Sequence, residues 1–209
     1  GADQMTRVYF VRHAQPEHDW EEDRTRPLTE EGKKDSAIVL EFLKDKKIDA
    51  FYCSPYKRSM DTITEAADFF TKEIITDERL REREKGLDGN NHGMFRKRWA
   101  DHNYHEEGGE SIAMVQKRNI EALNEILSDN TDKDIVIGTH GTALSTILNF
   151  YDNNFGCEDF LRIIDWMPYI IELDFESSCN EMESECPSYS FKLSGKREHC
   201  YIEKEFKGK

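Results

Sequence analysis

The sequence has no apolar run long enough to cross a membrane, and no secretory pattern opens the chain. Its five cysteines are odd in number and widely spaced, and none forms a C-x-x-C pair. Cys179, Cys186 and Cys200, together with His199, could be read as metal ligands, but their spacing is not that of a structural zinc site. We therefore expect free thiols, a reducing cytoplasmic setting and no metal.

Positive charge is also scarce, because 29 Lys and Arg face 43 Asp and Glu and leave a formal net charge of −14. This excess of acid argues against a general affinity for nucleic acid or for an anionic membrane. An anionic small-molecule substrate would therefore need a locally basic pocket. Hydrophobic residues make up 37% of the chain, which is enough for a globular protein with a real core.

No internal repeat and no clear linker divides the 209 residues, so we expect one domain over residues 5–209. Residues 1–4 (GADQ) precede Met5 and resemble a tag remnant, so they are left out of that domain. Strand-like and helix-like segments alternate along the chain. This alternation predicts an α/β fold, a three-layer sandwich with a mostly parallel central sheet flanked by helices.

Apolar runs and periodicity predict the individual elements. Strands are predicted at residues 7–11, 48–53, 73–76, 134–139 and 169–175. Helices are predicted at 26–46, from Ser54–Pro55 onward, at 111–127 and at 141–151. The first helix has Thr29 as N-cap, and its predicted apolar face consists of Ala37, Ile38 and Phe42. Two short runs on either side of Ser194–Gly195 predict a terminal hairpin, and residues 87–109 form an irregular, cap-like excursion.

Basic and histidine side chains follow three of the predicted strands. Arg12 and His13 come directly after the first, Arg58 lies one turn into the helix after the second, and His140 follows the strand at 134–139. A lone residue of this kind is usually structural, but the carboxyl ends of parallel strands meet at one edge and form a ligand site there. Arginine binds phosphate oxygens, histidine can attack phosphorus, and Gly141 would let the backbone approach a ligand.

Several segments, in order along the chain, resemble the motifs of the histidine phosphatase superfamily, which has the phosphoglycerate-mutase-like fold. They are RHA (12–14), RPLTEEGKKDS (26–36), YCSPYKRSMDTI (52–63), LREREKG (80–86), GGES (108–111) and VIGTHG (136–141). The resemblance extends from Val8 to about Phe175. One departure is Ala14, which stands where the family has a glycine.

The resemblance implies a phosphatase that hydrolyses a small phosphomonoester through a phosphohistidine on His13, with no metal or other cofactor. Arg12, Arg58, His140 and Gly141 would hold the phosphoryl group. Glu82 would be the catalytic acid, and Glu84 is the alternative.

Two other functions remain open. A phosphoglycerate mutase would share the first half-reaction, but the residues QPEHDW after the signature do not match the longer mutase pattern. A catalytically silent phosphate-binding regulatory module would usually lack one of the site residues, and here every candidate is present. The sequence leaves the choice between a monomer and a homodimer open.

Further residues are candidates for contact with the non-phosphate part of the substrate. They are Gln15, His18, Trp20, His92, Arg96 and Trp99. The alternative is that the excursion is a solvated cap with a few buried aromatics. His102, His105 and Glu106 could form a metal site, but on an exposed and charged segment we expect them to be ordinary surface residues.

Overall fold

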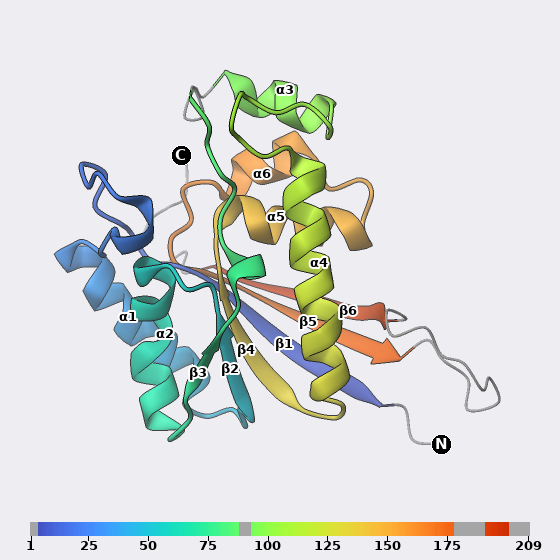
Figure 1. Ribbon diagram of the computed structural model, residues 1–209. Coiled ribbons are helices and arrows are strands. Elements are labelled where there is room, and N and C mark those ends of the chain that lie inside the picture. Colours follow the sequence, from blue (N-terminus) through green and yellow to red (C-terminus); the bar gives the residue numbers. More distant parts are fainter. Residues whose placement is uncertain (1–3, 88–92, 178–190, 201–209) are drawn as a thin grey trace.

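A six-stranded sheet forms the centre of the molecule, with strand order β3-β2-β4-β1-β5-β6 (Figure 1). The computed structural model describes residues 4–87, 93–177 and 191–200. Its strands are β1 Met5–Arg12, β2 Ala50–Cys53, β3 Ile74–Thr76, β4 Asp134–Thr139, β5 Tyr169–Ser177 and β6 Phe191–Cys200. Strands β1 to β4 pair in parallel, whereas β5 and β6 pair antiparallel. The predicted, mostly parallel centre is confirmed.

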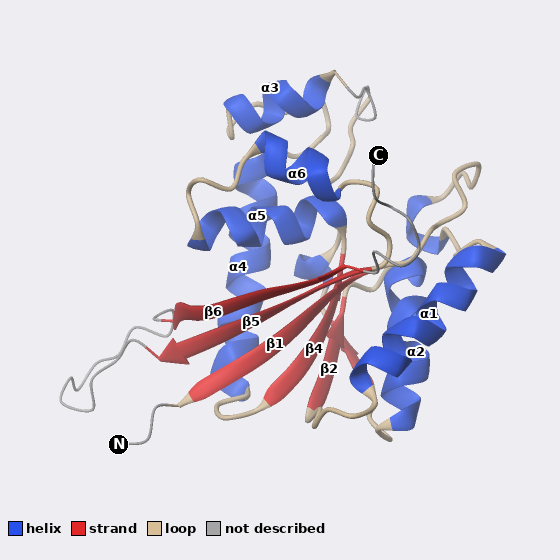
Figure 2. Ribbon diagram, turned by 180° about the vertical axis from the view of Figure 1, so that it is seen from behind, coloured by secondary structure: helices blue, strands red, loops and turns tan. Residues whose placement is uncertain are grey.

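Helices cover both faces of the sheet, which confirms the three-layer α/β prediction. They are α1 Glu30–Leu43, α2 Lys57–Phe69, α3 Met94–Ala100, α4 Ile112–Asp129, α5 Gly141–Tyr151 and α6 Cys157–Ile163, with single 3-10 turns η1 Asp23–Thr25 and η2 Glu78–Leu80. Figure 2 shows α1 and α2 on one face and α4 on the other. The parallel strands converge at the end where α6 and the loop between β1 and α1 lie.

The sheet separates two hydrophobic cores. On β1, Val8 and Phe10 face the core on the α4 side, whereas Tyr9 and Val11 face the core formed with α1 and α2. Strand β4 alternates in the same way, and both strands are buried on their two faces. This is why their sequences read as nearly continuous apolar runs, which made them easy to predict.

The predicted apolar face of α1 is only partly right: Phe42 packs against the core, but the fully buried ridge of the helix lies at other residues. Val39 and Leu43 are fully buried, and Gly32 lies on the same ridge. The predicted residues are exposed or only half-buried; they are Ala37, Ile38 and Phe42. Because Gly32 has no side chain, α1 approaches the backbone at Gln15 closely, and this contact sets the rotation.

The predicted helix start at Ser54–Pro55 is also displaced. Helix α2 begins at Lys57, after Tyr56 as N-cap. Oγ of Ser54 accepts from the N–H of Tyr56 at 3.3 Å and also lies 2.8 Å from Nε2 of His140. Ser54, which the sequence suggested as a helix N-cap, therefore contacts a histidine from a distant part of the chain.

The predicted terminal hairpin is wrong over the residues that the structure describes. Strand β6 runs through Ser194 and Gly195 and pairs with β5, with Asp174 opposite Gly195 and Phe175 opposite Leu193. Ser194 is the extra residue of a β-bulge, so the small residues mark a bulge and not a turn. The second half of the predicted hairpin, from residue 201, lies outside the described residues.

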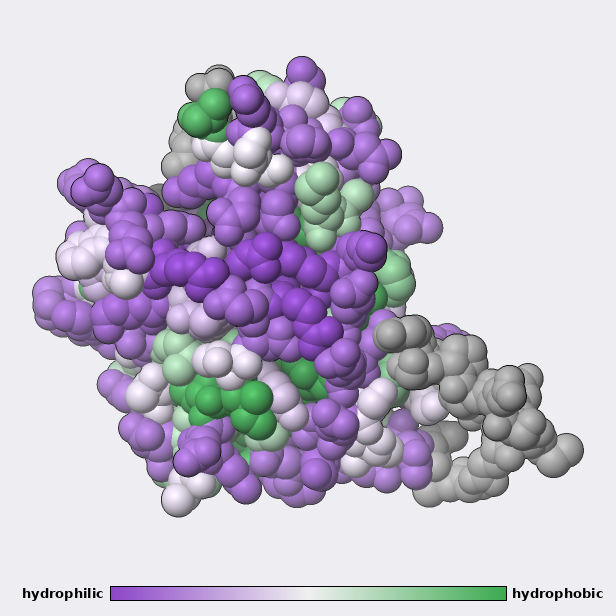
Figure 3. Space-filling view, viewed as in Figure 1, coloured by the Kyte–Doolittle hydropathy of each residue, from purple (hydrophilic) through white to green (hydrophobic). Residues whose placement is uncertain are grey.

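The face seen in Figure 3 is mainly hydrophilic, with an apolar patch in its lower half where β3 lies in Figure 1. Ile75 of β3 is 52% exposed. Among the described helices, none is long and apolar enough to cross a membrane.

The contact at Gly32 can be tested by Gly32→Ala. A Cβ at this position would lie 2.4 Å from the carbonyl oxygen of Gln15, which belongs to the backbone and cannot turn away as a side chain would. Alanine normally favours a helix interior, but we expect the clash to lower the free energy of unfolding by roughly 1–3 kcal/mol in urea denaturation. The control is Lys33→Ala, an exposed position on the same helix, where the change should be within about 0.5 kcal/mol. Equal or higher stability of Gly32→Ala would contradict this account of the packing.

Candidate active site

Two histidines lie side by side at the carboxyl ends of β1 and β4. The two strands are parallel neighbours with Arg12 opposite Thr139, and the backbone N–H of His13 donates to the carbonyl of Thr139 at 3.3 Å. The rings of His13 and His140 have centroids 5.3 Å apart, and the two residues are 5% and 0% exposed. Because the strands are buried and in register, both rings are held by the most rigid part of the fold.

The tautomer of His13 follows from one contact. Its Nδ1 lies 2.7 Å from the carbonyl oxygen of Ala14, and a carbonyl can only accept a hydrogen bond. Nδ1 therefore carries the proton and Nε2 keeps its lone pair. Burial, then Arg58 and Arg12, lower the pKa of His13 well below its ordinary value, so the ring is neutral at pH 7.

The turn after β1 is fixed by α2. The N–H of Ala14 donates to Oγ1 of Thr62 at 2.9 Å, and Ala14 is fully buried. Ala14 is not among the residues with positive φ, so a methyl group in place of the family's glycine strains nothing.

His140 is bound on one side of its ring and free on the other. Its Nε2 lies 2.8 Å from Oγ of Ser54 and 3.4 Å from Oγ of Ser59. Its Nδ1 is buried and has no hydrogen-bond partner among the described residues. Burial, then Arg58 and His13, lower the pKa of His140 well below its ordinary value. A bound anion would act in the opposite direction and favour the protonated ring.

Arg12 is anchored by the end of a helix. Its Nη1 donates to the carbonyls of Ile163 at 2.9 Å, Ile164 at 2.7 Å and Trp166 at 3.3 Å, at the C-terminus of α6. Helix C-termini stabilise cations. Burial lowers the pKa of Arg12 to about 10, so the guanidinium stays charged at pH 7. Its Nε is buried and lacks a partner among the described residues, which leaves a donor for a ligand.

The position of the Arg12 guanidinium leaves no room for a side chain at Gly141. A Cβ at Gly141 would lie 2.9 Å from Nη2 and 3.0 Å from Cζ of Arg12. The backbone at the start of α5 therefore lies directly against the guanidinium.

Arg58 lies in the first turn of α2 and is 5% exposed. Its Nη1 donates to the backbone carbonyl of Asp23 at 2.7 Å and lies 3.1 Å from Oδ1 of the same residue. Its guanidinium carbon is 5.2 Å from the centroid of the Tyr56 ring. Arg58 thus lies within the electrostatic range of both histidines, whose pKa values it lowers.

Glu82 reaches the same place from the segment after η2. Its Oε2 accepts from the N–H of Thr142 at 3.0 Å, and its Oε1 accepts from the N–H groups of Ala143 at 3.0 Å and Arg83 at 2.8 Å. The carboxylate therefore lies at the N-terminus of α5, two residues beyond His140. No ion pair joins it to Arg12 or Arg58 among the described contacts, as its proposed role requires.

Glu84 lies elsewhere. Its side chain is 50% exposed and pairs with Nε of Arg81 at 3.5 Å. The geometry therefore favours Glu82 as the carboxylate of the site.

The candidates for contact with the rest of the substrate are not gathered in one place. Gln15, His18 and Trp20 are exposed on the loop after β1, where Gln15 accepts from Thr29 and Trp20 donates to Thr25. In the excursion, Arg96 pairs with Glu158 of α6, and Trp99 is buried beside Phe155 and Phe160. These two residues attach the cap to the body of the protein. His92 lies outside the described residues.

The possible metal cluster of the excursion does not form. The expectation of ordinary surface residues is wrong for Glu106, which is buried and pairs with Arg98 and Arg83. Nδ1 of His105 lies 2.9 Å from the carbonyl oxygen of Glu106. His102 packs its ring against Trp99. No group of three possible metal ligands occurs within the described ranges.

Sequence reasoning missed several residues that hold the site together. Ser54, Ser59 and Thr62 contact His140 or the His13 turn, and all three lie in the segment YCSPYKRSMDTI. Ser59 and Thr62, three residues apart on α2, share a helix face, and that spacing was a usable signal. Asp23, which meets Arg58, and Arg118, which donates to the carbonyls of Arg79, Arg81 and Glu82, gave no such signal.

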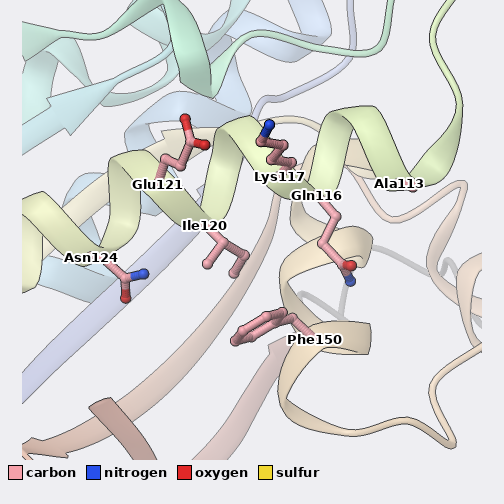
Figure 4. Close-up of a pocket in the computed structure, with 7 residues that line it drawn as sticks. All are labelled: Ala113, Gln116, Lys117, Ile120, Glu121, Asn124 and Phe150. Atoms are coloured by element: carbon pink, nitrogen blue, oxygen red, sulfur yellow. The ribbon is translucent and has the colours of Figure 1, made fainter. Parts of the chain in front are cut away.

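A hollow of about 440 Å³ lies away from this site, between α4 and α5 (Figure 4). It is open to solvent, and Ile120, Gln116 and Phe150 line it. None of the histidines or arginines described above is among its lining residues. It plays no part in the chemistry proposed below.

The depressed pKa values of His13 and His140 predict how stability depends on pH. In the unfolded chain both histidines bind protons near pH 6.5, whereas in the folded protein they remain neutral to lower pH. Stability is therefore full above pH 6.5 and falls as the pH decreases, by up to about 1.4 kcal/mol per pH unit for each histidine. Urea denaturation between pH 6.5 and 5.5 should show this slope, and His13→Ala should reduce it by about one proton. An unchanged slope in that variant would contradict the assignment.

The chain resembles known proteins over much of its length. It is 29% identical to phosphoserine phosphatase 1 of Hydrogenobacter thermophilus over 154 residues, which is 65% of this chain and 71% of that protein. It is 44% identical to the 2,3-bisphosphoglycerate-dependent phosphoglycerate mutase of Thermoplasma acidophilum, but over only 55 residues, which is 26% of this chain and 28% of the mutase.

Solved structures share the fold. The mycobacterial glucosyl-3-phosphoglycerate phosphatase superposes with a TM-score of 0.72 at 18% identity, over 90% of this chain and 97% of that one. A family model described as histidine phosphatase superfamily (branch 1) matches residues 8–164 and so includes all five catalytic candidates. The chain belongs to the histidine phosphatase superfamily, branch 1.

Proposed function

We propose that this protein is a phosphatase that hydrolyses a small phosphomonoester through a phosphohistidine at His13. The observation that carries the proposal is the lone pair on Nε2 of His13, fixed by the Nδ1 contact with Ala14. This nucleophile lies beside His140 and within the electrostatic range of Arg12 and Arg58, which can supply donors and positive charge for phosphoryl oxygens. Membership of the family supports the same chemistry.

The reaction has two steps. In the first, Nε2 of His13 attacks phosphorus, the P–O bond to the leaving group breaks, and Glu82 gives its proton to the departing alcohol. In the second, water attacks phosphorus and the P–N bond breaks, while Glu82 takes a proton from the water. The N–H groups of Thr142 and Ala143 hold the carboxyl group of Glu82 in place for both proton transfers.

The named relatives suggest which substrates to examine first. One is a phosphoserine phosphatase and one is a glucosyl-3-phosphoglycerate phosphatase, so phosphoserine and glucosyl-3-phosphoglycerate head the panel of phosphorylated metabolites. Release of inorganic phosphate by the purified protein is the assay. A generic aryl phosphate belongs in the panel, because failure to turn over any ester would favour a silent phosphate-binding module.

A mutase is the second candidate, because one relative over a short segment is a phosphoglycerate mutase. A mutase returns the phosphoryl group to a hydroxyl of the substrate and not to water. Assays with 3-phosphoglycerate, with and without the bisphosphate primer, separate the two. Isomerisation without release of phosphate would show a mutase.

The setting we propose is a cytoplasmic enzyme, monomer or homodimer, that does not bind nucleic acid. The net charge of −14 and the odd number of widely spaced cysteines support it. We also propose that residues 5–209 act as one domain, with 87–109 as a cap beside the site and residues 1–4 as a tag remnant. The ties of Arg96 and Trp99 to α6 and the core support the cap.

His13→Ala should lose at least about a thousandfold in kcat, because it removes the covalent nucleophile. Circular dichroism should show an intact fold, since most of the core does not depend on this side chain. Near-normal turnover by the folded variant would overturn the mechanism.

Glu82→Gln and Glu84→Gln form a matched pair for the acid. An alkyl alcohol leaves poorly without a proton, whereas a nitrophenolate leaves well without one. Glu82→Gln should therefore slow hydrolysis of an alkyl phosphate by about 10²-fold or more and affect p-nitrophenyl phosphate far less. Glu84→Gln should show no such contrast, because its side chain lies in solvent beside Arg81. If neither variant distinguishes the two esters, the acid is another residue.

A further inference from the structure

Asp23 places a carboxylate where three cationic side chains of the site meet. Its Oδ1 lies 3.1 Å from Nη1 of Arg58, 3.6 Å from Nε of Arg26 and 3.9 Å from Nζ of Lys85. Its backbone carbonyl also accepts from Nη1 of Arg58 at 2.7 Å. One oxygen atom thus serves as counter-charge for cations from three different parts of the chain.

These cations act on the proposed phosphate site. Burial is the largest cause of the lowered pKa values of His13 and Lys85, and the charges of Arg58 and Arg26 lower both values further. Arg58 and Arg26 therefore lie within electrostatic range of the nucleophile and of Lys85. Arg58, Arg26 and Lys85 form what we call the cationic rim. Like charges this close repel one another unless an anion lies between them. In the ligand-free protein that anion is Asp23.

We propose that Asp23 is a built-in counter-ion that weakens the binding of phosphate at His13 and so promotes release of inorganic phosphate, the last product. The proposal rests on the proposed function, because it requires that phosphate bind beside Arg58. Asp23 would touch no reacting atom and would act through Arg58, as a positioning residue.

Two physical effects of Asp23 both weaken the binding of phosphate. A phosphate dianion that enters between Arg58 and His13 comes close to the negative charge of Asp23 and is repelled by it. Asp23 also holds Nη1 of Arg58, so that donor is occupied before phosphate arrives. Without the charge of Asp23, the cationic rim would lose the carboxylate that contacts all three of its members. Phosphate would then bind more tightly and leave more slowly.

The position of Asp23 does not depend on its own side chain. The turn η1 is tied to η2 by Arg24, whose two Nη atoms donate to the carboxylate of Glu78 at 2.8 and 2.7 Å. Thr25 in the same turn accepts from Nε1 of Trp20 at 3.0 Å. Asparagine at position 23 would keep the backbone carbonyl and an amide oxygen for Arg58 and would remove only the charge. Asp23→Asn therefore tests charge and not shape.

The experiment is isothermal titration of inorganic phosphate into the wild-type protein, Asp23→Asn and Asp19→Asn. Asp19 lies in the same loop, is exposed, and makes no side-chain contact among those of the described residues, so its variant controls for the same change in net charge. We expect Kd for phosphate to fall roughly tenfold in Asp23→Asn and by less than about twofold in Asp19→Asn. In turnover assays, Asp23→Asn should show a lower Ki for phosphate and a lower kcat at high substrate concentration.

A merely structural role for Asp23 would not tighten binding. If Asp23→Asn binds phosphate no more tightly than Asp19→Asn, the inference is wrong. Weaker binding by Asp23→Asn would also overturn it, and would show that the carboxylate orients Arg58 for phosphate. If the wild-type protein binds no phosphate, the proposed function itself fails, so the two failures are distinguishable.

Discussion

The hydrogen bond from Nδ1–H of His13 to the carbonyl of Ala14 is the contact on which the account of the site depends. It gives Nε2 its lone pair, and it holds the ring only because the backbone at Ala14 is itself fixed. Thr62 of α2 holds the N–H of Ala14, and Thr139 of β4 accepts from the N–H of His13. A nucleophile on a flexible loop would spend most of its time out of line with phosphorus.

The other groups of the site stabilise the positive charges of two buried arginines. Arg12 is stabilised by the carbonyls at the end of α6, and Arg58 by the carbonyl and carboxylate of Asp23. The two histidines avoid charge altogether, because burial and the arginines keep them neutral. Nδ1 of His140 and Nε of Arg12 are buried and have no hydrogen-bond partner in the described part of the chain, and a phosphoryl group would supply one.

The features that were predicted best from the sequence are the buried strands and the residues at their ends. The apolar runs of β1 and β4 located both strand ends, and with them His13 and His140, because parallel neighbours end at the same edge of the sheet. Prediction failed where the local structure is determined by a contact with a residue distant in sequence. The contact of Gly32 with Gln15 sets the rotation of α1, and a bulge at Ser194 stands where a turn was predicted. Ser54 contacts His140 as well as the N–H of Tyr56 before α2. No sequence pattern pointed to Asp23, because two of its three cationic partners, Arg58 and Lys85, are distant from it in sequence.

The most direct test of the central claim is the location of a phosphoryl group trapped during turnover. The protein would be mixed with an aryl phosphate, quenched within milliseconds under alkaline denaturing conditions that preserve phosphohistidine, digested, and examined by tandem mass spectrometry. The account predicts a phosphoryl group on the peptide that contains His13, and on that histidine. A phosphoryl group on His140 or on another residue of a protein that turns over the ester would contradict it.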